Sequence, residues 1–177
     1  MKIIIEKAIY RSTLEKNEKL IHRKWVIDFP DTINFIVWSN WSWKSTLLER
    51  IADKYNLDIY NENSSKRFKW DCQYETNMIS MIQEILSSSW ESYFYSLVDF
   101  INNSTTDYIL IDEPEKSLCL QAQIWLAHLF ADKLKEWKKF IIVTHSYILL
   151  HFANINNIPV YDFDTKKFSK NYLPKLW

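Results

Sequence analysis

The sequence predicts an α/β fold in which a mainly parallel sheet is flanked by helices and antiparallel strands form the N-terminal edge. Short apolar or β-branched runs alternate with stretches of helical periodicity along most of the 177 residues, which is the pattern of parallel strands joined by helices. Several of these runs are continuously apolar, as expected for strands that are buried on both faces. Polar clusters directly follow three of the runs, at the strand ends where ligands bind in such folds.

The first half of the chain is expected to begin with two strands, at residues 3–10 and about 20–29. The β-branched run Ile33–Val37 predicts the next strand, which stops at Trp38. After a polar loop, a helix is expected from Lys44, because apolar residues then recur at helical spacing. The order is therefore strand, loop and helix.

The second half of the chain is expected to continue as alternating helices and strands. Residues 56–75 are polar and irregular, which is typical of a loop. The expected elements are, in order, helices at 76–86 and 90–101, a strand at 108–111, a helix at 121–136, a strand at 140–143, a short helix at 147–154 and a final strand at 158–163. Because no repeat or linker interrupts this order, residues 1–177 are expected to form a single domain.

The composition is that of a soluble globular protein, with 47% hydrophobic and 25% charged residues. The 22 basic and 22 acidic residues cancel, so the total charge does not indicate a nucleic-acid or membrane partner. No apolar run approaches the ~20 residues of a membrane helix, and the N-terminal run is too short for a signal peptide. We therefore expect a cytoplasmic protein without a membrane span. Cys72 and Cys119 are isolated, which argues against a disulfide framework and a zinc site.

The glycine content is abnormal, because the chain has no glycine and nine tryptophans. Average usage would give roughly a dozen glycines in a chain of this length. Glycine alone reaches positive φ without steric cost and lets the backbone approach a ligand closely. A chain of this type without glycine is therefore expected to be strained at many turns, and tryptophan is the suspected substitute.

Two of the polar clusters carry residues suited to phosphate chemistry. Asp112 and Glu113 end one predicted strand, and Lys44, Ser45 and Thr46 open a helix after another. Because the carboxyl ends of parallel strands meet at one edge of a sheet, these clusters are expected to converge there. A carboxylate pair and a lysine beside hydroxyls is the arrangement that magnesium-assisted phosphoryl transfer needs.

The loop after Val37 becomes a phosphate-binding motif if glycine replaces three of its tryptophans. The segment WSNWSWKST then reads GSNGSGKST, which satisfies G-x-x-x-x-G-K-[ST] between a strand and a helix. Its amides would hold the phosphates, Lys44 would neutralise the β and γ oxygens, and Ser45 would coordinate Mg²⁺. The expected loop consists of Trp38, Ser39, Asn40, Trp41, Ser42, Trp43, Lys44, Ser45 and Thr46. The alternative is that residues 42–46 only cap a helix beside an aromatic cluster.

With these motifs in order, the chain resembles the soluble P-loop ATPases that have an ATP-binding-cassette-type head. The family includes small predicted ATPases of the AAA type and the heads of chromosome-maintenance and repair proteins. In it, the glycine-rich loop is followed by a serine-rich signature, a strand ending in Asp-Glu-Pro and a strand ending in Thr-His-Ser. All four occur here in that order within residues 20–165, so the resemblance implies ATP and Mg²⁺ as ligands.

The resemblance also implies roles for three residues at the strand ends. Asp112 is similar to the ligand of the Mg²⁺ ion, and Glu113 to the general base that polarises the attacking water. His145 is similar to the histidine that reaches the γ-phosphate, and an imidazole can donate to a phosphate oxygen without full charge. The alternatives are a solvated acidic turn for the two carboxylates and a helix cap for His145.

The segment SSSWES resembles the family's signature loop. Ser88 corresponds to the serine that contacts the nucleotide of the opposite subunit, and Trp90 to the signature glycine. The resemblance therefore implies a homodimer on ATP binding, in which two heads enclose two nucleotides. The alternative is a serine cap on the helix that follows. The chain departs from the family after Asp-Glu-Pro, where Leu118 is followed by Cys119 instead of Asp or His.

Four tryptophans, at positions 38, 41, 43 and 90, stand where this family has glycine, and Trp137 stands at a predicted helix end where glycine is common. Either UGA specifies glycine in the source genome and was translated as tryptophan, or glycine was deliberately replaced. If the rings are genuine, they are expected to fill the triphosphate space, to force unfavourable φ values and to abolish most ATP binding. The residues then leave two further hypotheses open, namely a nucleotide-independent scaffold that binds a partner protein and, among the ATPases, an ATP-gated clamp on nucleic acid.

Overall fold

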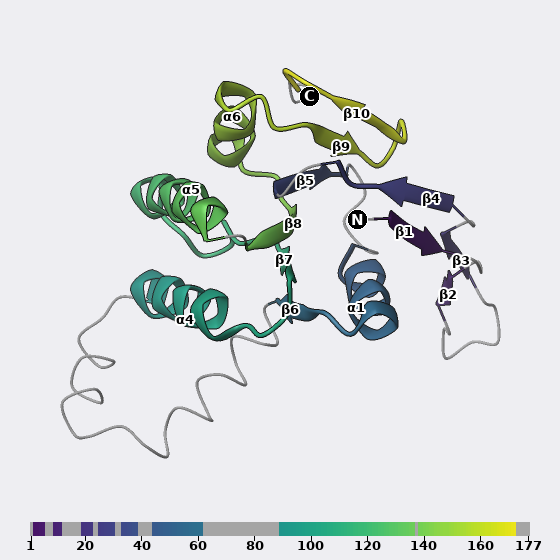
Figure 1. Cartoon of the computed structure of the whole chain (residues 1–177), viewed down its shortest axis with the longest axis horizontal. Helices are drawn as coiled ribbons and strands as arrows, with labels where there is room; N and C mark the ends of the chain where they lie inside the picture. The colour runs from purple at the N-terminus through teal and green to yellow at the C-terminus, as the bar shows by residue number, and fades with distance from the viewer. Residues whose placement is uncertain are drawn as a thin grey trace, which may run out of the picture. The chain divides into compact units, whose positions relative to one another are not determined.

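The computed structural model of the chain contains two compact units, Met1–Asp31 and Thr32–Trp177. It describes residues 2–5, 9–11, 19–22, 25–30, 33–38, 44–61, 89–136 and 138–172, which are coloured in Figure 1. The predicted helix at 76–86 and Cys72 lie outside these residues. No helix in the described ranges is long and apolar enough to cross a membrane.

The N-terminal unit consists of antiparallel strand pairs. Its strands are β1 (Lys2–Ile5), β2 (Ile9–Arg11), β3 (Lys19–His22) and β4 (Trp25–Asp28). β1 pairs with β4 and β2 pairs with β3, both antiparallel. Ile3 lies opposite Ile27 and both are buried, whereas Val26 is exposed, which is the alternation of a strand with one buried face. The antiparallel N-terminal strands are confirmed, although each predicted strand contains two shorter ones.

The larger unit contains a six-stranded sheet with the order β10-β9-β5-β8-β7-β6. Its strands are β5 (Ile33–Val37), β6 (Asp58–Tyr60), β7 (Tyr108–Asp112), β8 (Lys139–Val143), β9 (Val160–Asp162) and β10 (Lys167–Ser169). All neighbours are parallel except β10, which is antiparallel to β9. The predicted mainly parallel sheet is therefore confirmed. Two edge strands were not predicted, since β6 lies in the stretch expected to be a loop and β10 follows the strand expected to be the last.

Helices cover both faces of this sheet (Figure 1). They are α1 (Lys44–Tyr55), α4 (Ser89–Asn103), α5 (Leu120–Lys135) and α6 (Tyr147–Ile155). Ile109 and Ile111 of β7 belong to the core cluster with α4, α5 and α6. Leu110 lies between them, equally buried but outside that cluster, because its side chain points to the other face. α1 contacts β6 and β7 there. Burial on both faces explains why the central strands are continuously apolar.

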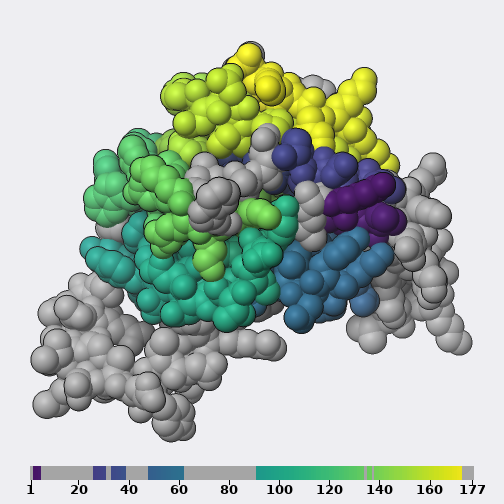
Figure 2. All heavy atoms as spheres, viewed as in Figure 1, coloured from purple at the N-terminus to yellow at the C-terminus, as the bar shows by residue number. Residues whose placement is uncertain are grey.

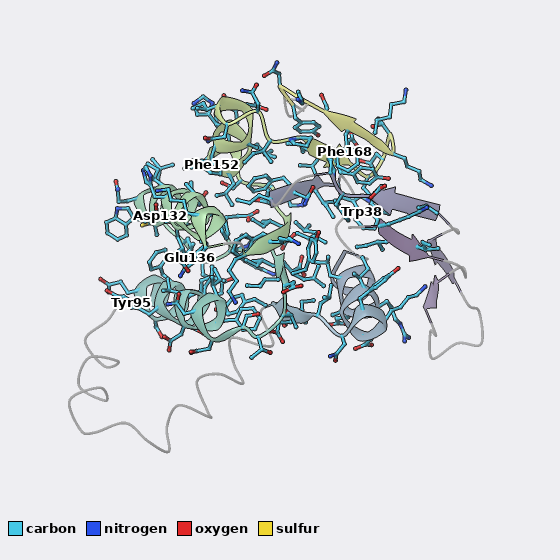
Figure 3. The ribbon with its side chains drawn as sticks, in the orientation of Figure 1. Trp38, Tyr95, Asp132, Glu136, Phe152 and Phe168 are labelled. Atoms are coloured by element: carbon cyan, nitrogen blue, oxygen red, sulfur yellow. The ribbon has the colours of Figure 1, made fainter. Side chains whose placement is uncertain are left out.

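In the space-filling view, the atoms of α4, α5 and α6 adjoin one another and form one layer on their side of the sheet (Figure 2). Figure 3 shows Phe152 of α6 on the inner side, where its ring meets Phe35 of β5 edge to face at 6.5 Å. Tyr95 projects outward from α4 and is 67% exposed. The helices thus bury one apolar face each, as expected for amphipathic helices that pack on a sheet.

Asparagine takes the place of glycine at two helix ends. Asn56 follows α1 with a φ of 50°, and Asn157 follows α6 with a φ of 54°. The next residue in each case donates its N–H to the carbonyl five residues earlier, from Leu57 to Ala52 at 3.0 Å and from Ile158 to Ala153 at 2.8 Å. This is the Schellman motif, whose left-handed position is usually glycine and sometimes asparagine. Asparagine therefore fills the left-handed position at these two ends, because it tolerates this conformation better than most other side chains do.

Candidate active site

The strand order brings the predicted polar clusters to one edge of the sheet. β8 lies between β5 and β7, and Val143 pairs with both Ile36 and Asp112. The segments that follow these three strands therefore leave the sheet side by side. With neighbouring strands about 4.8 Å apart, the segment after β8 leaves the sheet between the end of β5 at Val37 and the acidic pair at the end of β7. The helix α1 begins at Lys44 as predicted.

The acidic pair is held by the end of the β7 ladder. Asp112 is the last residue of β7 and only 8% exposed. The alternative of a solvated acidic turn is therefore wrong for Asp112. The N–H of Glu113 donates to the carbonyl of Val143 at 2.9 Å, so pairing with β8 continues one residue beyond β7. Glu113 has a φ of 48°. A non-glycine residue in this region costs about 1–3 kcal/mol and often marks a functional site.

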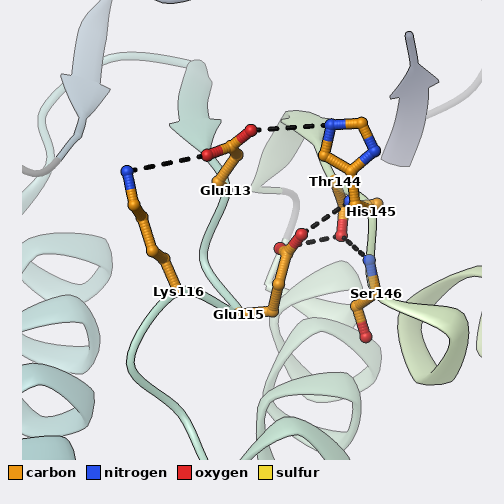
Figure 4. Close-up of polar contacts among 6 residues, drawn as sticks. All are labelled: Glu113, Glu115, Lys116, Thr144, His145 and Ser146. Atoms are coloured by element: carbon orange, nitrogen blue, oxygen red, sulfur yellow. Dashed lines mark hydrogen bonds and ion pairs between the residues drawn. The ribbon is translucent and has the colours of Figure 1, made fainter. Parts of the chain in front are cut away.

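Glu113 faces an imidazole and an ammonium group (Figure 4). Its Oε1 lies 3.6 Å from Nε2 of His145, and its Oε2 lies 3.8 Å from Nζ of Lys116. The side chain of Glu113 is 25% exposed and that of His145 is 39% exposed. The separation from Lys116 is long for an ion pair in partly solvated surroundings, so this pair is expected to contribute about 0–1 kcal/mol. The contact with His145 places a carboxylate and an imidazole from two neighbouring strands at one point.

The segment after β8 is anchored at both sides of His145. The N–H of His145 donates to Oε1 of Glu115 at 2.6 Å, and the hydroxyl of Thr144 donates to Oε2 at 2.8 Å. Ser146 is the N-cap of α6, where its Oγ accepts from the N–H of Leu149 at 3.2 Å. The helix cap at this position is therefore Ser146 and not His145, because only the serine has a hydroxyl aimed at the first turn.

Glu115 and Gln123 are the polar residues of this site that the sequence analysis missed. Gln123 of α5 accepts from the hydroxyl of Ser146 at 2.6 Å and donates to the carbonyl of Leu118 at 3.0 Å. Glu115 and His145 are 30 positions apart, and Gln123 and Ser146 are 23 apart. The only local signal was the acidic residue directly after Asp-Glu-Pro, and nothing marked Gln123.

Trp38 is the one tryptophan of the loop whose side chain the structure describes. It follows β5 directly (Figure 3), is 8% exposed and stacks on Phe163 with ring centroids 3.7 Å apart and planes at 23°. The N–H of Phe163 donates to the carbonyl of Val37 at 2.9 Å, which holds the two segments together. Trp38 is not among the described residues with positive φ. The expected unfavourable φ is therefore wrong for Trp38, where glycine would matter through its missing side chain.

Other predicted site residues are not tested by these contacts. The loop residues 39–43 and Ser88 lie outside the described residues, and the side chains of residues 44–46 and of Trp90 do so as well. The backbone of Trp90 belongs to α4. Their binding roles stay predictions.

The residues that are described suit a magnesium ion that takes few protein ligands. They contain no group of three His, Cys, Asp or Glu side chains that could enclose a metal. Mg²⁺ bound with a nucleotide needs no such cage, because it keeps several waters and takes phosphate oxygens and one or two protein ligands. The buried carboxylate of Asp112 at the strand end provides one hard oxygen donor of the kind required.

Comparison with solved structures identifies the architecture. No protein-family model matches the sequence, and no curated protein sequence is similar to it. The structure is similar to a dimeric structure of MJ0796, described as a bacterial ABC transporter cassette, with a TM-score of 0.64 and 11% identity over 92% of this chain and 94% of that one. A dimeric post-hydrolysis state of the same ATP-binding cassette, bound to ADP and Pi, gives 0.64 and 11% over 98% and 100%. The chain has the fold of an ATP-binding cassette. This confirms the predicted cassette-type P-loop fold.

The cassette fold accounts for the positions of the polar clusters. Within it, β5 comes directly before the predicted nucleotide loop in the sequence. Asp112 ends β7 and Glu113 follows it, and His145 follows β8, which lies between β5 and β7. The AAA label stays a prediction, as does the single domain of residues 1–177.

Proposed function

We propose that this cassette binds ATP and hydrolyses it with Mg²⁺, in the form of the chain that has glycine at the tryptophan positions of the loop. The observation that carries the proposal is the approach of Glu113 to His145, 3.6 Å apart at the edge of the sheet where α1 begins. A reaction at the ends of β7 and β8 would use both groups. A cassette fold supports a nucleotide as the ligand of that edge, and a cytoplasmic location belongs to the same proposal.

Residues at the ends of β5, β7 and β8 would bind the phosphates, bind Mg²⁺ and take part in the reaction. The backbone amides of residues 38–46, which include the N-terminus of α1, would hold the phosphates. The side chain of Lys44 would neutralise the β and γ oxygens. Ser45 and Asp112 would hold Mg²⁺, which when bound supplies positive charge beside the phosphate oxygens. Glu113 would accept a proton from the attacking water, and His145 would donate a hydrogen bond to the terminal phosphate.

The nucleotide site would be completed by a second copy of the chain. The cassettes that this structure resembles are described as dimeric, and the proposed signature residues Ser88 and Trp90 are those that a partner's nucleotide would contact. Association of two copies would then depend on ATP, because the nucleotides would form much of the interface. A partner protein or a nucleic acid driven by this cycle is a further part of the proposal.

The test compares the chain with a variant that carries glycine at positions 38, 41, 43 and 90. Equilibrium binding of labelled ATP is expected for the glycine variant, and the further change Lys44→Ala should abolish it. Trp125→Ala is a matched control, because Trp125 lies on α5 and is 46% exposed. It should not create ATP binding. If the folded glycine variant does not bind ATP, the enzyme proposal is wrong and a nucleotide-independent scaffold replaces it.

The coding DNA provides a second test that needs no protein. UGA codons at positions 38, 41, 43 and 90, in a genome whose UGA-decoding tRNA carries glycine, would support the ATPase. UGG codons in a genome with the standard code would mean that the rings are genuine and would favour the scaffold.

A further inference from the structure

Glu115 binds the segment after β8 through both of its carboxylate oxygens. Oε1 accepts the N–H of His145 at 2.6 Å, and Oε2 accepts the hydroxyl of Thr144 at 2.8 Å (Figure 4). Hydrogen bonds to an ionised carboxylate belong to the strong class. Because Glu115 lies two residues after Glu113, one short turn carries both the carboxylate that faces the imidazole of His145 and the carboxylate that holds its backbone.

A second connection runs through Gln123. Its Oε1 accepts from the hydroxyl of Ser146 at 2.6 Å, and its Nε2 donates to the carbonyl of Leu118 at 3.0 Å. The N–H of Ser146 in turn donates to Oγ1 of Thr144 at 2.9 Å. Residues 144–146 are therefore attached to the turn after β7 at two points, one near Glu113 and one at Leu118.

The turn after β7 has its own internal contacts. The N–H of Lys116 donates to the carbonyl of Glu113 at 2.9 Å, and the N–H of Leu118 donates to the carbonyl of Glu115 at 3.0 Å. Ser117 has a φ of 72°, and Leu118 is buried in the core cluster. Hydrogen bonds therefore connect Leu118 to Glu115 within the turn and to Gln123 of α5.

We propose that Glu115 and Gln123 are positioning residues that hold His145 against Glu113 and link it to the segment 117–119. This inference rests on the proposed ATPase function. Neither residue is assigned a contact with ATP or with the attacking water. Their effect is on geometry, because an imidazole displaced by about 1 Å from a reacting group can cost on the order of 100-fold in rate.

The first measurement is amide hydrogen exchange in the chain as it stands, which needs no ATP. Glu115→Ala removes both acceptors and should speed exchange of the His145 amide by at least about tenfold, because that N–H loses its partner. Glu115→Gln retains an acceptor oxygen and should preserve most of the protection. Glu136→Gln is the matched control, since Glu136 pairs only with Lys133 at the exposed end of α5 in the described contacts, and it should change nothing.

The second measurement is steady-state turnover in the glycine variant. Glu115→Ala and Gln123→Ala should lower kcat by roughly 10–100-fold and leave KM within about threefold, because they remove an arrangement used in the reaction and not in ATP binding. Glu115→Gln should restore most of kcat. A purely structural role would instead lower the yield of folded protein without separating kcat from KM.

The outcomes distinguish this inference from the proposed function. If the glycine variant itself has no turnover, the proposed function fails and the positioning role fails with it. If the glycine variant is active and Glu115→Ala leaves either the exchange of His145 or kcat unchanged, the positioning role alone is wrong. Faster exchange together with reduced kcat, unchanged KM and recovery by Glu115→Gln supports the inference.

Discussion

Replacing Trp38 by alanine tests whether this ring is a structural part of the fold. The indole is 8% exposed and stacks on Phe163 at 3.7 Å. An aromatic side chain of this size buries roughly 150–250 Å². With about nine-tenths of the residue buried and ~25 cal/mol per Å², the lost transfer free energy is roughly 3.4–5.6 kcal/mol. This is an upper value, because the unfolded chain already buries some surface.

Measured losses for truncating a buried tryptophan are about 3–5 kcal/mol, so we expect Trp38→Ala to lower the free energy of unfolding by that amount. The assay is urea denaturation followed by far-UV circular dichroism. Trp125→Ala should cost clearly less, because Trp125 is 46% exposed. A double-mutant cycle with Phe163→Ala should give a coupling free energy of about 0.5–1.5 kcal/mol from the stacked pair.

A loss below about 1 kcal/mol for Trp38→Ala, or no coupling with Phe163, would refute the packing argument and leave the ring without a structural role. The magnitude also matters for the ATP-binding test. A domain of this size is typically stable by about 5–15 kcal/mol, so the glycine variant has to be shown to be folded before a lack of ATP binding is interpreted.

Three other predictions concern single side chains. Glu113→Gln in the glycine variant should keep ATP binding, lower turnover by about 10²–10⁴-fold and favour the dimer in size-exclusion chromatography with ATP; unchanged turnover would remove Glu113 from its role. Asn157→Gly should leave the unfolding free energy unchanged, whereas Asn157→Ala should lower it by about 1–2 kcal/mol, because alanine is disfavoured at positive φ; equal effects in urea denaturation would contradict this reason. Burial raises the pKa of Tyr60 to about 12, against the opposing hydrogen bond with Ser96. The folded state therefore keeps this proton above pH 10, where the unfolded state loses it, and stability should fall by on the order of 2–3 kcal/mol as the pH rises from about 10 to 12. Tyr60→Phe should remove that part of the loss, and an unchanged pH profile would show that Tyr60 titrates normally.

The central elements were predicted nearly to the residue. The strand expected at 33–37 is β5, the strand expected at 140–143 is β8, and the helix expected at 147–154 is α6. These segments are buried, so their apolar pattern is dictated by the core and is visible in the sequence. The edge strands β6 and β10 were missed because each has three residues and is largely exposed or half-buried, and a short partly solvated strand has no such pattern.

The candidate site likewise contains residues that the sequence predicted and residues that it did not. Asp112, Glu113 and His145 were predicted because each lies at or just beyond the end of a buried strand, and in a parallel sheet that position is enough to bring them to one edge. Glu115 and Gln123 were not, because their partners lie 30 and 23 positions away. Hydrogen bonds over such separations depend on how the strands pair and leave no periodic signal.

The sequence by itself determined the alternation of buried strands and amphipathic helices, the order of the polar clusters and the anomaly of a chain with tryptophan where a phosphate loop needs glycine. Each of these is a local property, set by side-chain polarity and backbone freedom. The tertiary structure alone decided that β8 lies between β5 and β7, that Glu113 meets His145, that asparagine closes two helix ends and that Trp38 packs on Phe163. These depend on which segments become neighbours, and that choice is made by the burial of the whole core.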